Sequence, residues 1–261
     1  MTMSKTENVL HGLASESKPA LIGYFPAGYP TVAESVEACV AMCESGVDVL
    51  ELGVPYNDPV KDGLVIQVAT EQALANGFKL SQFFAMVKEI TSRVDTPVLV
   101  MSYWNPIMQY GIERFAMDLK AAGGAGLITP DLIPDEAADW IRLSEELDLD
   151  RVFLATPSSS PERLAQVSRL SRGFIYAVST MGITGAREDL DAKAKAVVSG
   201  LHDTQTSVPI CVGIGISTAD QVSEVNSYAD GAIVGSVFIK AYRDGGLEAL
   251  KKSVIELKGK Q

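Results

Sequence analysis

Residues 49–63 read Val49-Leu50-Glu51-Leu52-Gly53-Val54-Pro55-Tyr56-Asn57-Asp58-Pro59-Val60-Lys61-Asp62-Gly63. The start of this stretch completes an almost unbroken apolar run from Val47 to Leu52, which is typical of a buried strand. Glu51 interrupts the run near its end, and a loop that carries the carboxylates Asp58 and Asp62 follows. A charged side chain in a buried strand is costly unless it is paired or used. Glu51 is therefore a candidate functional residue.

Seven other short apolar runs accompany this one. Each is too short for a core helix, and unbroken apolar character is what a parallel sheet covered on both faces requires. The eight predicted strands are 20–25, 47–52, 97–101, 126–129, 151–155, 173–178, 208–213 and 231–234.

Amphipathic segments with recognisable helix starts lie between the runs. Thr31 begins a capping box, Ser81 precedes apolar residues at helical spacing, and Ser160 stands before a proline. Ser217 or Thr218 caps a further segment.

The alternation of strand and helix repeats eight times, and no linker or shift in composition divides the chain. We therefore expect a parallel (β/α)8 barrel, an α/β fold, with residues 1–18 as an N-terminal extension and 19–261 as a single barrel domain. An open doubly wound sheet is the alternative. The segment 26–28 after the first strand lacks the GxGxxG pattern, which counts against it. In a barrel, Glu51 lies at the C-terminal end of a strand, where such folds carry their active sites.

Composition narrows the function. The formal net charge of −11 over 261 residues argues against nucleic acid and anionic membranes as partners. No cysteine or histidine spacing suits a metal. The two histidines are isolated in the sequence, which argues against acid/base catalysis by histidine. We see no signal peptide in the first 18 residues and no apolar run near the roughly 20 residues of a membrane span, so we expect a soluble cytoplasmic protein.

Two glycine-rich segments, 211–217 and 232–236, follow the seventh and eighth strands. Glycine lets backbone amides approach an anion, and a helix N-terminus adds partial positive charge. Barrel enzymes often bind phosphate at this place. Ordinary tight turns are the alternative for either segment alone. Neither contains lysine or arginine, so phosphate binding would rest mainly on backbone amides.

Other loop and strand-end residues fit the same face. The small residues of 179–187, after the sixth strand, suit a lid that closes over substrate, although a plain connection has the same composition. Tyr24, Tyr103, Trp104 and Tyr176 stand at or just past strand ends, where they line a pocket or pack in the core.

These motifs closely resemble the tryptophan synthase alpha chain family. The resemblance covers nearly the whole chain. Its most specific part joins Glu51-Leu52-Gly53-Val54-Pro55 to Asp58-Pro59, Asp62-Gly63 and Ile66-Gln67. The other matching motifs are Pro26-Ala27-Gly28-Tyr29-Pro30, Asn105-Pro106, Pro130-Asp131-Leu132, Gly182-Ile183-Thr184-Gly185-Ala186, Gly213-Ile214-Gly215-Ile216-Ser217 and Gly235-Ser236.

The resemblance implies a barrel lyase that cleaves indole-3-glycerol phosphate to indole and glyceraldehyde 3-phosphate in tryptophan biosynthesis. The reaction is a retro-aldol cleavage without metal, Schiff base or cofactor in this chain. The resemblance also implies a beta chain partner that holds pyridoxal phosphate, in an alpha2beta2 heterotetramer.

The same resemblance implies roles for individual residues. Glu51 would be the acid/base residue and Asp62 the second catalytic carboxylate. The indole pocket would consist of Tyr24, Tyr103, Ile128 and Tyr176; the phosphate site of Gly185, Gly215, Gly235 and Ser236; the lid contact of Thr184; and the partner interface of Asp58, Pro59, Asn105 and Asp131.

The chain departs from the family pattern in its loops. Lys61 stands where alanine is common, Leu64 replaces a frequent proline, Tyr56-Asn57 replaces Phe-Ser, and Thr180 replaces a common arginine. These changes bear on loop behaviour and coupling to the beta chain rather than on the two carboxylates.

Two other functions compete. A ketose isomerase on the same fold predicts a second acid or base at a different strand end, and the sequence shows none beyond Glu51. A chain that only docks to a partner has no need of both Glu51 and Asp62.

Overall fold

The computed structural model describes residues 3–178, 187–213 and 215–259, and of residues 187–191 it describes the backbone alone. Its strands lie close to the predicted ones. They are β1 (Leu21–Pro26), β2 (Val49–Gly53), β3 (Val98–Met101), β4 (Gly126–Ile128), β5 (Asp150–Val152), β6 (Leu154–Ala155), β7 (Ile175–Val178), β8 (Ile210–Gly213) and β9 (Gly231–Val234).

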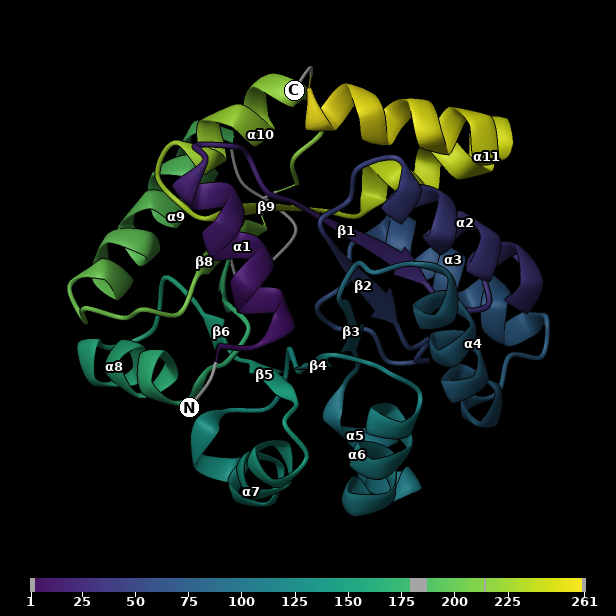
Figure 1. Ribbon diagram of the computed structural model, residues 1–261, viewed down its shortest axis with the longest axis horizontal. Coiled ribbons are helices and arrows are strands. Elements are labelled where there is room, and N and C mark those ends of the chain that lie inside the picture. Colours follow the sequence, from purple (N-terminus) through teal and green to yellow (C-terminus); the bar gives the residue numbers. More distant parts are fainter. Residues whose placement is uncertain (1–2, 179–186, 214, 260–261) are drawn as a thin grey trace.

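The helices surround this sheet (Figure 1). They are α1 (Lys5–Ser15), α2 (Val32–Glu44), α3 (Leu64–Ala75), α4 (Leu80–Arg93), α5 (Trp104–Tyr110), α6 (Ile112–Ala121), η1 (Pro134–Glu136), α7 (Ala138–Glu146), α8 (Pro161–Leu170), α9 (Arg187–His202), α10 (Ala219–Asn226) and α11 (Ser236–Lys258). Helix α11 bends at Gly245 and Gly246, whose backbone angles are not helical.

The sheet closes through the fifth predicted strand. Residues Asp150–Val152 pair with β4, whereas Leu154–Ala155 pair with β7, and every paired neighbour is parallel. The amide of Tyr176 donates to the carbonyl of Phe153 between the two halves. One stretch of chain thus joins both ends of the sheet, as the stagger of a closed barrel requires. The predicted (β/α)8 barrel is confirmed, and the open sheet is excluded.

Most predicted helix starts are confirmed. The hydroxyls of Thr31, Ser160 and Thr218 each accept a backbone N–H in the first turn of their helix. The start at Ser81 was wrong, because α4 begins at Leu80. Its first turn is closed by the side chain of Gln82, which accepts the Lys79 amide. Two further helices, α3 and α5, lengthen the loops after β2 and β3.

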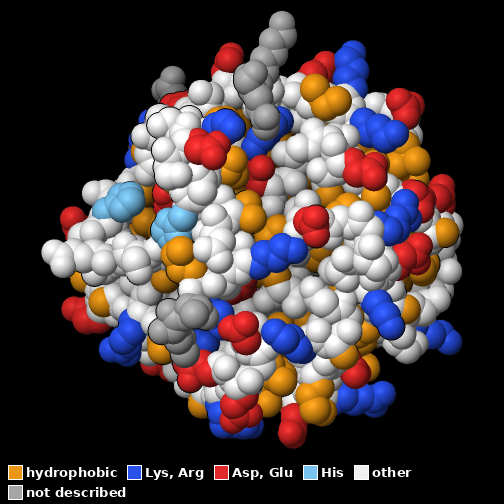
Figure 2. Space-filling view, in the orientation of Figure 1, with side chains coloured by type: hydrophobic (Ala, Val, Ile, Leu, Met, Phe, Trp, Pro, Cys, Tyr) orange, Lys and Arg blue, Asp and Glu red, His pale blue; other side chains and the backbone are white. Residues whose placement is uncertain are grey.

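Helix α1 closes the N-terminal end of the barrel. Leu10 is fully buried and packs with the inward-facing strand residues. In Figure 1, α1 lies across this end of the ring. Figure 2 shows the same face, where acidic and basic side chains are interspersed as on a solvated surface. The inward-facing partners of Leu10 are Ala20, Ile22, Val49, Leu99, Ile128, Val152, Phe174, Cys211 and Ile233.

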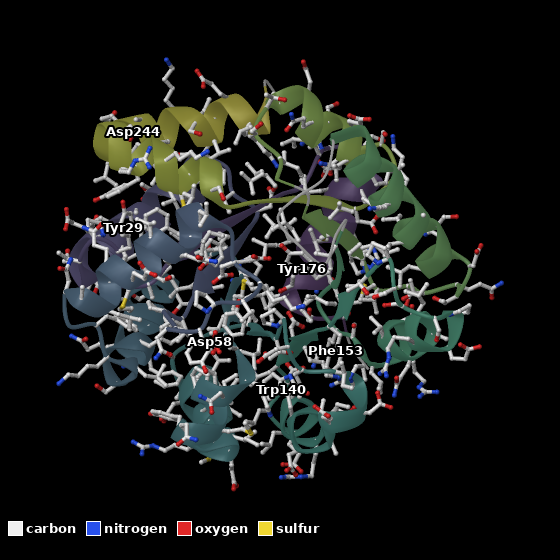
Figure 3. All side chains as sticks on the ribbon, turned by 180° about the vertical axis from the view of Figure 1, so that it is seen from behind. Tyr29, Asp58, Trp140, Phe153, Tyr176 and Asp244 are labelled. Carbon is white, nitrogen blue, oxygen red and sulfur yellow. The ribbon has the colours of Figure 1, made fainter. Side chains whose placement is uncertain are left out.

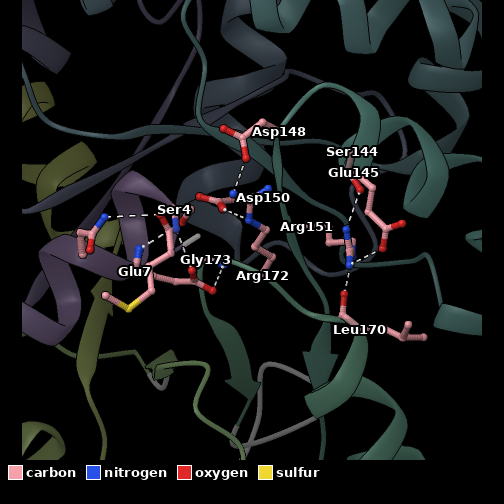
Figure 4. A network of polar contacts seen from close by, with 12 residues as sticks. Ser4, Glu7, Ser144, Glu145, Asp148, Asp150, Arg151, Leu170, Arg172 and Gly173 are labelled. Atoms are coloured by element: carbon pink, nitrogen blue, oxygen red, sulfur yellow. Dashed lines mark hydrogen bonds and ion pairs between the residues drawn. The ribbon is translucent and has the colours of Figure 1, made fainter. Parts of the chain in front are cut away.

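Polar contacts fasten α1 to strands that come much later in the chain (Figure 4). Ser4 and Glu7 form a capping box at the start of α1. The second carboxylate oxygen of Glu7 accepts the Gly173 amide at 3.3 Å. Burial raises the pKa of the neighbouring Asp150 to about 6, and Arg172 lies 3.8 Å from its carboxylate. Of the extension predicted for 1–18, the described residues 3–18 therefore pack as part of the barrel's base, while the domain boundary at residue 18 stays a prediction.

Within the described ranges, no helix combines the length and apolar character needed to cross a membrane. Within the same ranges, no three His, Cys, Asp or Glu side chains gather where they could hold a metal ion.

Leu10→Ala is expected to lower the free energy of unfolding by about 2–4 kcal/mol, because it opens a cavity in the barrel base. Urea unfolding followed by circular dichroism measures the change. Leu64→Ala makes the same truncation where the side chain is 70% exposed, and it should change stability little. Equal losses in the two variants would contradict the role of α1 as part of the core.

Candidate active site

A cavity of about 980 Å³ opens at the C-terminal ends of the strands. Figure 3 views the molecule from the side opposite α1, with Tyr176 near the middle of the ring and Asp58 toward α5 and α6. Residues from β1, β2, β3, β6, β7, β8 and β9 line the cavity, together with residues from the loops after β2, β4, β6, β8 and β9. The cavity therefore lies at the end of the barrel where the sequence predicts the active site.

Glu51 lies in the cavity wall on β2, with Tyr24 of β1 and Leu99 of β3 as its strand neighbours. Its side chain is 1% exposed, and its Oε1 atom has no hydrogen-bond partner among the described residues. Burial raises the pKa of Glu51 from 4.5 to about 8. The carboxyl group is therefore protonated at neutral pH and able to donate.

Asp62 lines the same cavity from the loop after β2 and is 8% exposed. Burial raises its pKa to about 6, and a hydrogen bond from Tyr103 acts in the opposite direction. Asp62 is thus ionised at neutral pH while Glu51 is not. A pair of carboxyl groups whose pKa values are pushed apart is suited to separate roles of proton donor and electrostatic stabiliser.

Two of the four predicted indole-pocket residues, Tyr24 and Tyr176, line the cavity. The other two, Tyr103 and Ile128, are buried. Ile128 belongs to the barrel interior. Nearby glycines make room for both wall tyrosines. A Cβ atom on Gly53 would stand 2.2 Å from the Tyr24 hydroxyl, and one on Gly213 would stand 2.5 Å from that of Tyr176.

The predicted phosphate residues Gly215, Gly235 and Ser236 all line the cavity. Helix α11 begins at Ser236, so its N-terminus lies at the cavity. Lys240, one turn further on, also lines the cavity, and sequence reasoning missed it. The spacing of four residues from Ser236 was the available signal, since such positions share a helix face.

Two predicted residues cannot be placed. Gly185 and Thr184, with most of the predicted lid, lie in 179–186, outside the described residues.

The predicted partner residues lie on the loops after β2, β3 and β4. Asp58, Asn105 and Asp131 are exposed, and Pro59 is half-buried. Both carboxylate oxygens of Asp131 accept the Trp104 amide, at 2.9 and 3.2 Å. Asp131 also lines the cavity, so a carboxylate at a second strand end does exist. It is engaged at the start of α5 rather than beside Glu51.

The fold and the site define a (β/α)8 barrel with an acid–base cavity at the C-terminal ends of its strands. The family model described as tryptophan synthase alpha chain matches residues 10–260. The chain belongs to this family. It is therefore a lyase of tryptophan biosynthesis, and the isomerase alternative is not favoured. The expected fold, family and reaction class are confirmed.

Individual members of the family resemble this chain closely in sequence and in structure. The tryptophan synthase alpha chain of Leifsonia xyli is 59% identical over 255 residues, which cover 98% of this chain and 97% of the relative. That of Nocardia farcinica is 50% identical, covering 97% and 94%. A structure of Mycobacterium tuberculosis tryptophan synthase has a TM-score of 0.92 at 46% identity, covering 98% of both chains. The alpha subunit from Legionella pneumophila gives 0.87 at 32% identity, also over 98% of both.

Glu51→Gln is expected to stabilise the fold, by up to about 3 kcal/mol at pH 7. The unfolded chain releases the Glu51 proton near pH 4.5 and the folded chain near pH 8. The wild type therefore loses stability as pH rises between these values, and the variant lacks that loss. Thermal unfolding at several pH values, with the exposed substitution Glu71→Gln as control, measures the difference. A variant less stable than wild type at pH 8 would argue against a costly buried carboxylate.

Proposed function

We propose that this chain performs the family's alpha reaction with Glu51 as proton shuttle and Asp62 as electrostatic stabiliser. The reaction splits indole-3-glycerol phosphate into indole and glyceraldehyde 3-phosphate. The observation that carries the proposal is the pair of buried carboxyl groups in one cavity, one protonated and one ionised at neutral pH.

The proton transfers that the reaction requires fit this pair of carboxyl groups. The Glu51 carboxyl group gives its proton to indole C3, which turns the ring into an electrophilic indolenine cation. The resulting Glu51 carboxylate takes the proton of the hydroxyl on the carbon attached to C3. As that carbonyl forms, the carbon–carbon bond breaks and its electron pair returns to the indole ring. The Asp62 carboxylate stabilises the positive charge at the ring N–H in between.

The two ends of the cavity orient the substrate. Gly215, Gly235 and Ser236 hold the phosphate through backbone amides and the start of α11, and Lys240 adds a positive charge. Tyr24 and Tyr176 hold the indole ring beside Glu51. Tyr103 and Ile128 complete the indole pocket in this proposal. Gly185 and Thr184 complete the phosphate site and the lid in this proposal, on the strength of the family resemblance alone.

The partner of this chain is a tryptophan synthase beta chain, in an alpha2beta2 assembly whose pyridoxal phosphate lies in the beta chain. Docking takes place on the face with Asp58, Pro59, Asn105 and Asp131. Exposed apolar side chains on the same loops and helices support this choice, because such groups mark interfaces. They are Val60, Leu64, Val68, Met108 and Ile133. We place the assembly in the cytoplasm.

Glu51→Gln should lower kcat for cleavage by roughly 1,000-fold, because it removes the proton donor. Asp62→Asn should lower kcat by roughly 100-fold or more with KM nearly unchanged, because it removes charge stabilisation. Release of indole from indole-3-glycerol phosphate is the assay. Loss of affinity alone in Asp62→Asn would contradict its role.

The pH profile of kcat/KM is the accompanying control. Wild-type activity should fall below about pH 6, where Asp62 takes up a proton, and above about pH 8, where Glu51 loses one. Asp62→Asn should remove the fall in activity on the acid side, and Glu51→Gln should remove the fall on the basic side.

Lys240→Met should raise KM about fivefold with kcat little changed, since it removes a charge from the phosphate end without touching the reacting atoms. Lys252→Met, at a 76% exposed position of the same helix, is the matched control. An unchanged KM in Lys240→Met would remove Lys240 from the phosphate site.

A further inference from the structure

Tyr103 has contacts that its predicted role in the indole pocket does not require. The residue is 5% exposed. Its hydroxyl oxygen accepts the backbone N–H of Lys61 at 2.8 Å. The same hydroxyl hydrogen-bonds the carboxylate of Asp62, the next residue in the loop. Tyr103 therefore contacts the Asp62 loop at both its backbone and its catalytic side chain.

A second set of contacts joins the same two segments. The rings of Tyr56 and Tyr103 lie with their centroids 5.3 Å apart. The Asn105 side-chain amide donates to the Tyr56 hydroxyl at 3.1 Å. Both contacts connect the loop after β2 with the start of α5.

Few other bonds hold this loop. Between Pro55 and Asp62, the remaining hydrogen bonds among the described residues run within the loop or to Gln67 of the adjoining helix α3. Those that leave the loop and α3 lead to Tyr103 and Asn105. The position of the Asp62 carboxylate in the cavity thus depends on the start of α5.

The start of α5 is in turn fixed from the next loop. Tyr103 is the N-cap residue of α5, and the following amide, of Trp104, donates to the Asp131 carboxylate. Asp131 and Asn105 are exposed on the face proposed for docking. A continuous set of bonds therefore runs from this surface, through one turn of α5, to Asp62.

We infer that Tyr103 is a positioning residue that holds the Asp62 carboxylate in the cavity. The inference rests on the proposed function. It assigns Tyr103 a hydrogen bond to the catalytic loop, beside its predicted place in the indole pocket.

The chemistry of the hydroxyl group suits this role. Burial, with the nearby Asp62 charge, raises the pKa of Tyr103 well above its ordinary value. The hydroxyl therefore stays protonated over the working pH range, so it donates to the Asp62 carboxylate while accepting from Lys61 N–H. The Asp62 charge also acts on Tyr24 and Tyr176, and the charges of Asp131 and Asp58 act on Tyr103. Glu51 and Lys61 line the same cavity.

Tyr103→Phe tests the positioning role, because it removes the hydroxyl and keeps the ring. We expect kcat of the isolated chain to fall at least tenfold with KM changed less than threefold. The acid limb of the pH profile should move upward, because Asp62 loses a hydrogen bond that favours its ionised form. Tyr110→Phe, on the same helix, removes a hydroxyl that bonds Asp118 instead and is the matched control.

Hydrogen exchange of the Lys61 amide gives a readout that does not depend on activity. Exchange should be at least tenfold faster in Tyr103→Phe than in wild type or Tyr110→Phe. Unchanged exchange would overturn the positioning role even if activity fell. If wild type fails to cleave indole-3-glycerol phosphate, the proposed function fails, and exchange at Lys61 still decides whether Tyr103 holds the loop.

Discussion

Glu51 enters the barrel on a strand whose five residues are all buried, and the cost of ionising a carboxyl group there governs the rest of the site. Burial keeps the proton on Glu51 at neutral pH, and within the described part of the chain its Oε1 atom has no hydrogen-bond partner. A rigid strand is needed for this, because a mobile segment would carry the group to water and return its pKa to the ordinary range. The neighbouring Asp62 stands on a loop, where partial exposure and a tyrosine hydroxyl keep it ionised. Glu51 on the strand and Asp62 on the loop therefore differ in protonation state at neutral pH.

Much of this could be predicted from the sequence because the decisive signals are local. Unbroken apolar runs gave the strands, and a lone carboxylate inside one of them marked Glu51. The glycines after the last two strands indicated a further part of the cavity lining. Each of these inferences needs only the residues within a few positions of the one in question.

What could not be predicted depends on the stagger of the closed ring. Nothing near Phe153 says that the chain on one side of it pairs with β4 and on the other with β7. The place of Tyr103 after β3 likewise does not predict that its hydroxyl accepts the Lys61 amide, 42 residues earlier in the chain. Both features are set by contacts between residues far apart in the chain. Lys240, in contrast, could have been found, because it lies four residues after Ser236 on the same helix face.

The closure of the base by α1 has a consequence for how the chain acquires its structure. Glu7 bonds a residue 166 positions later, and Leu10 packs against residues as late as Ile233. During synthesis the first helix therefore emerges long before its binding place exists, and it waits for nearly the whole ring to form. Contacts of such separation slow folding, because the loop that they close must be ordered first. The earliest segment of the chain is thus the one that completes the barrel.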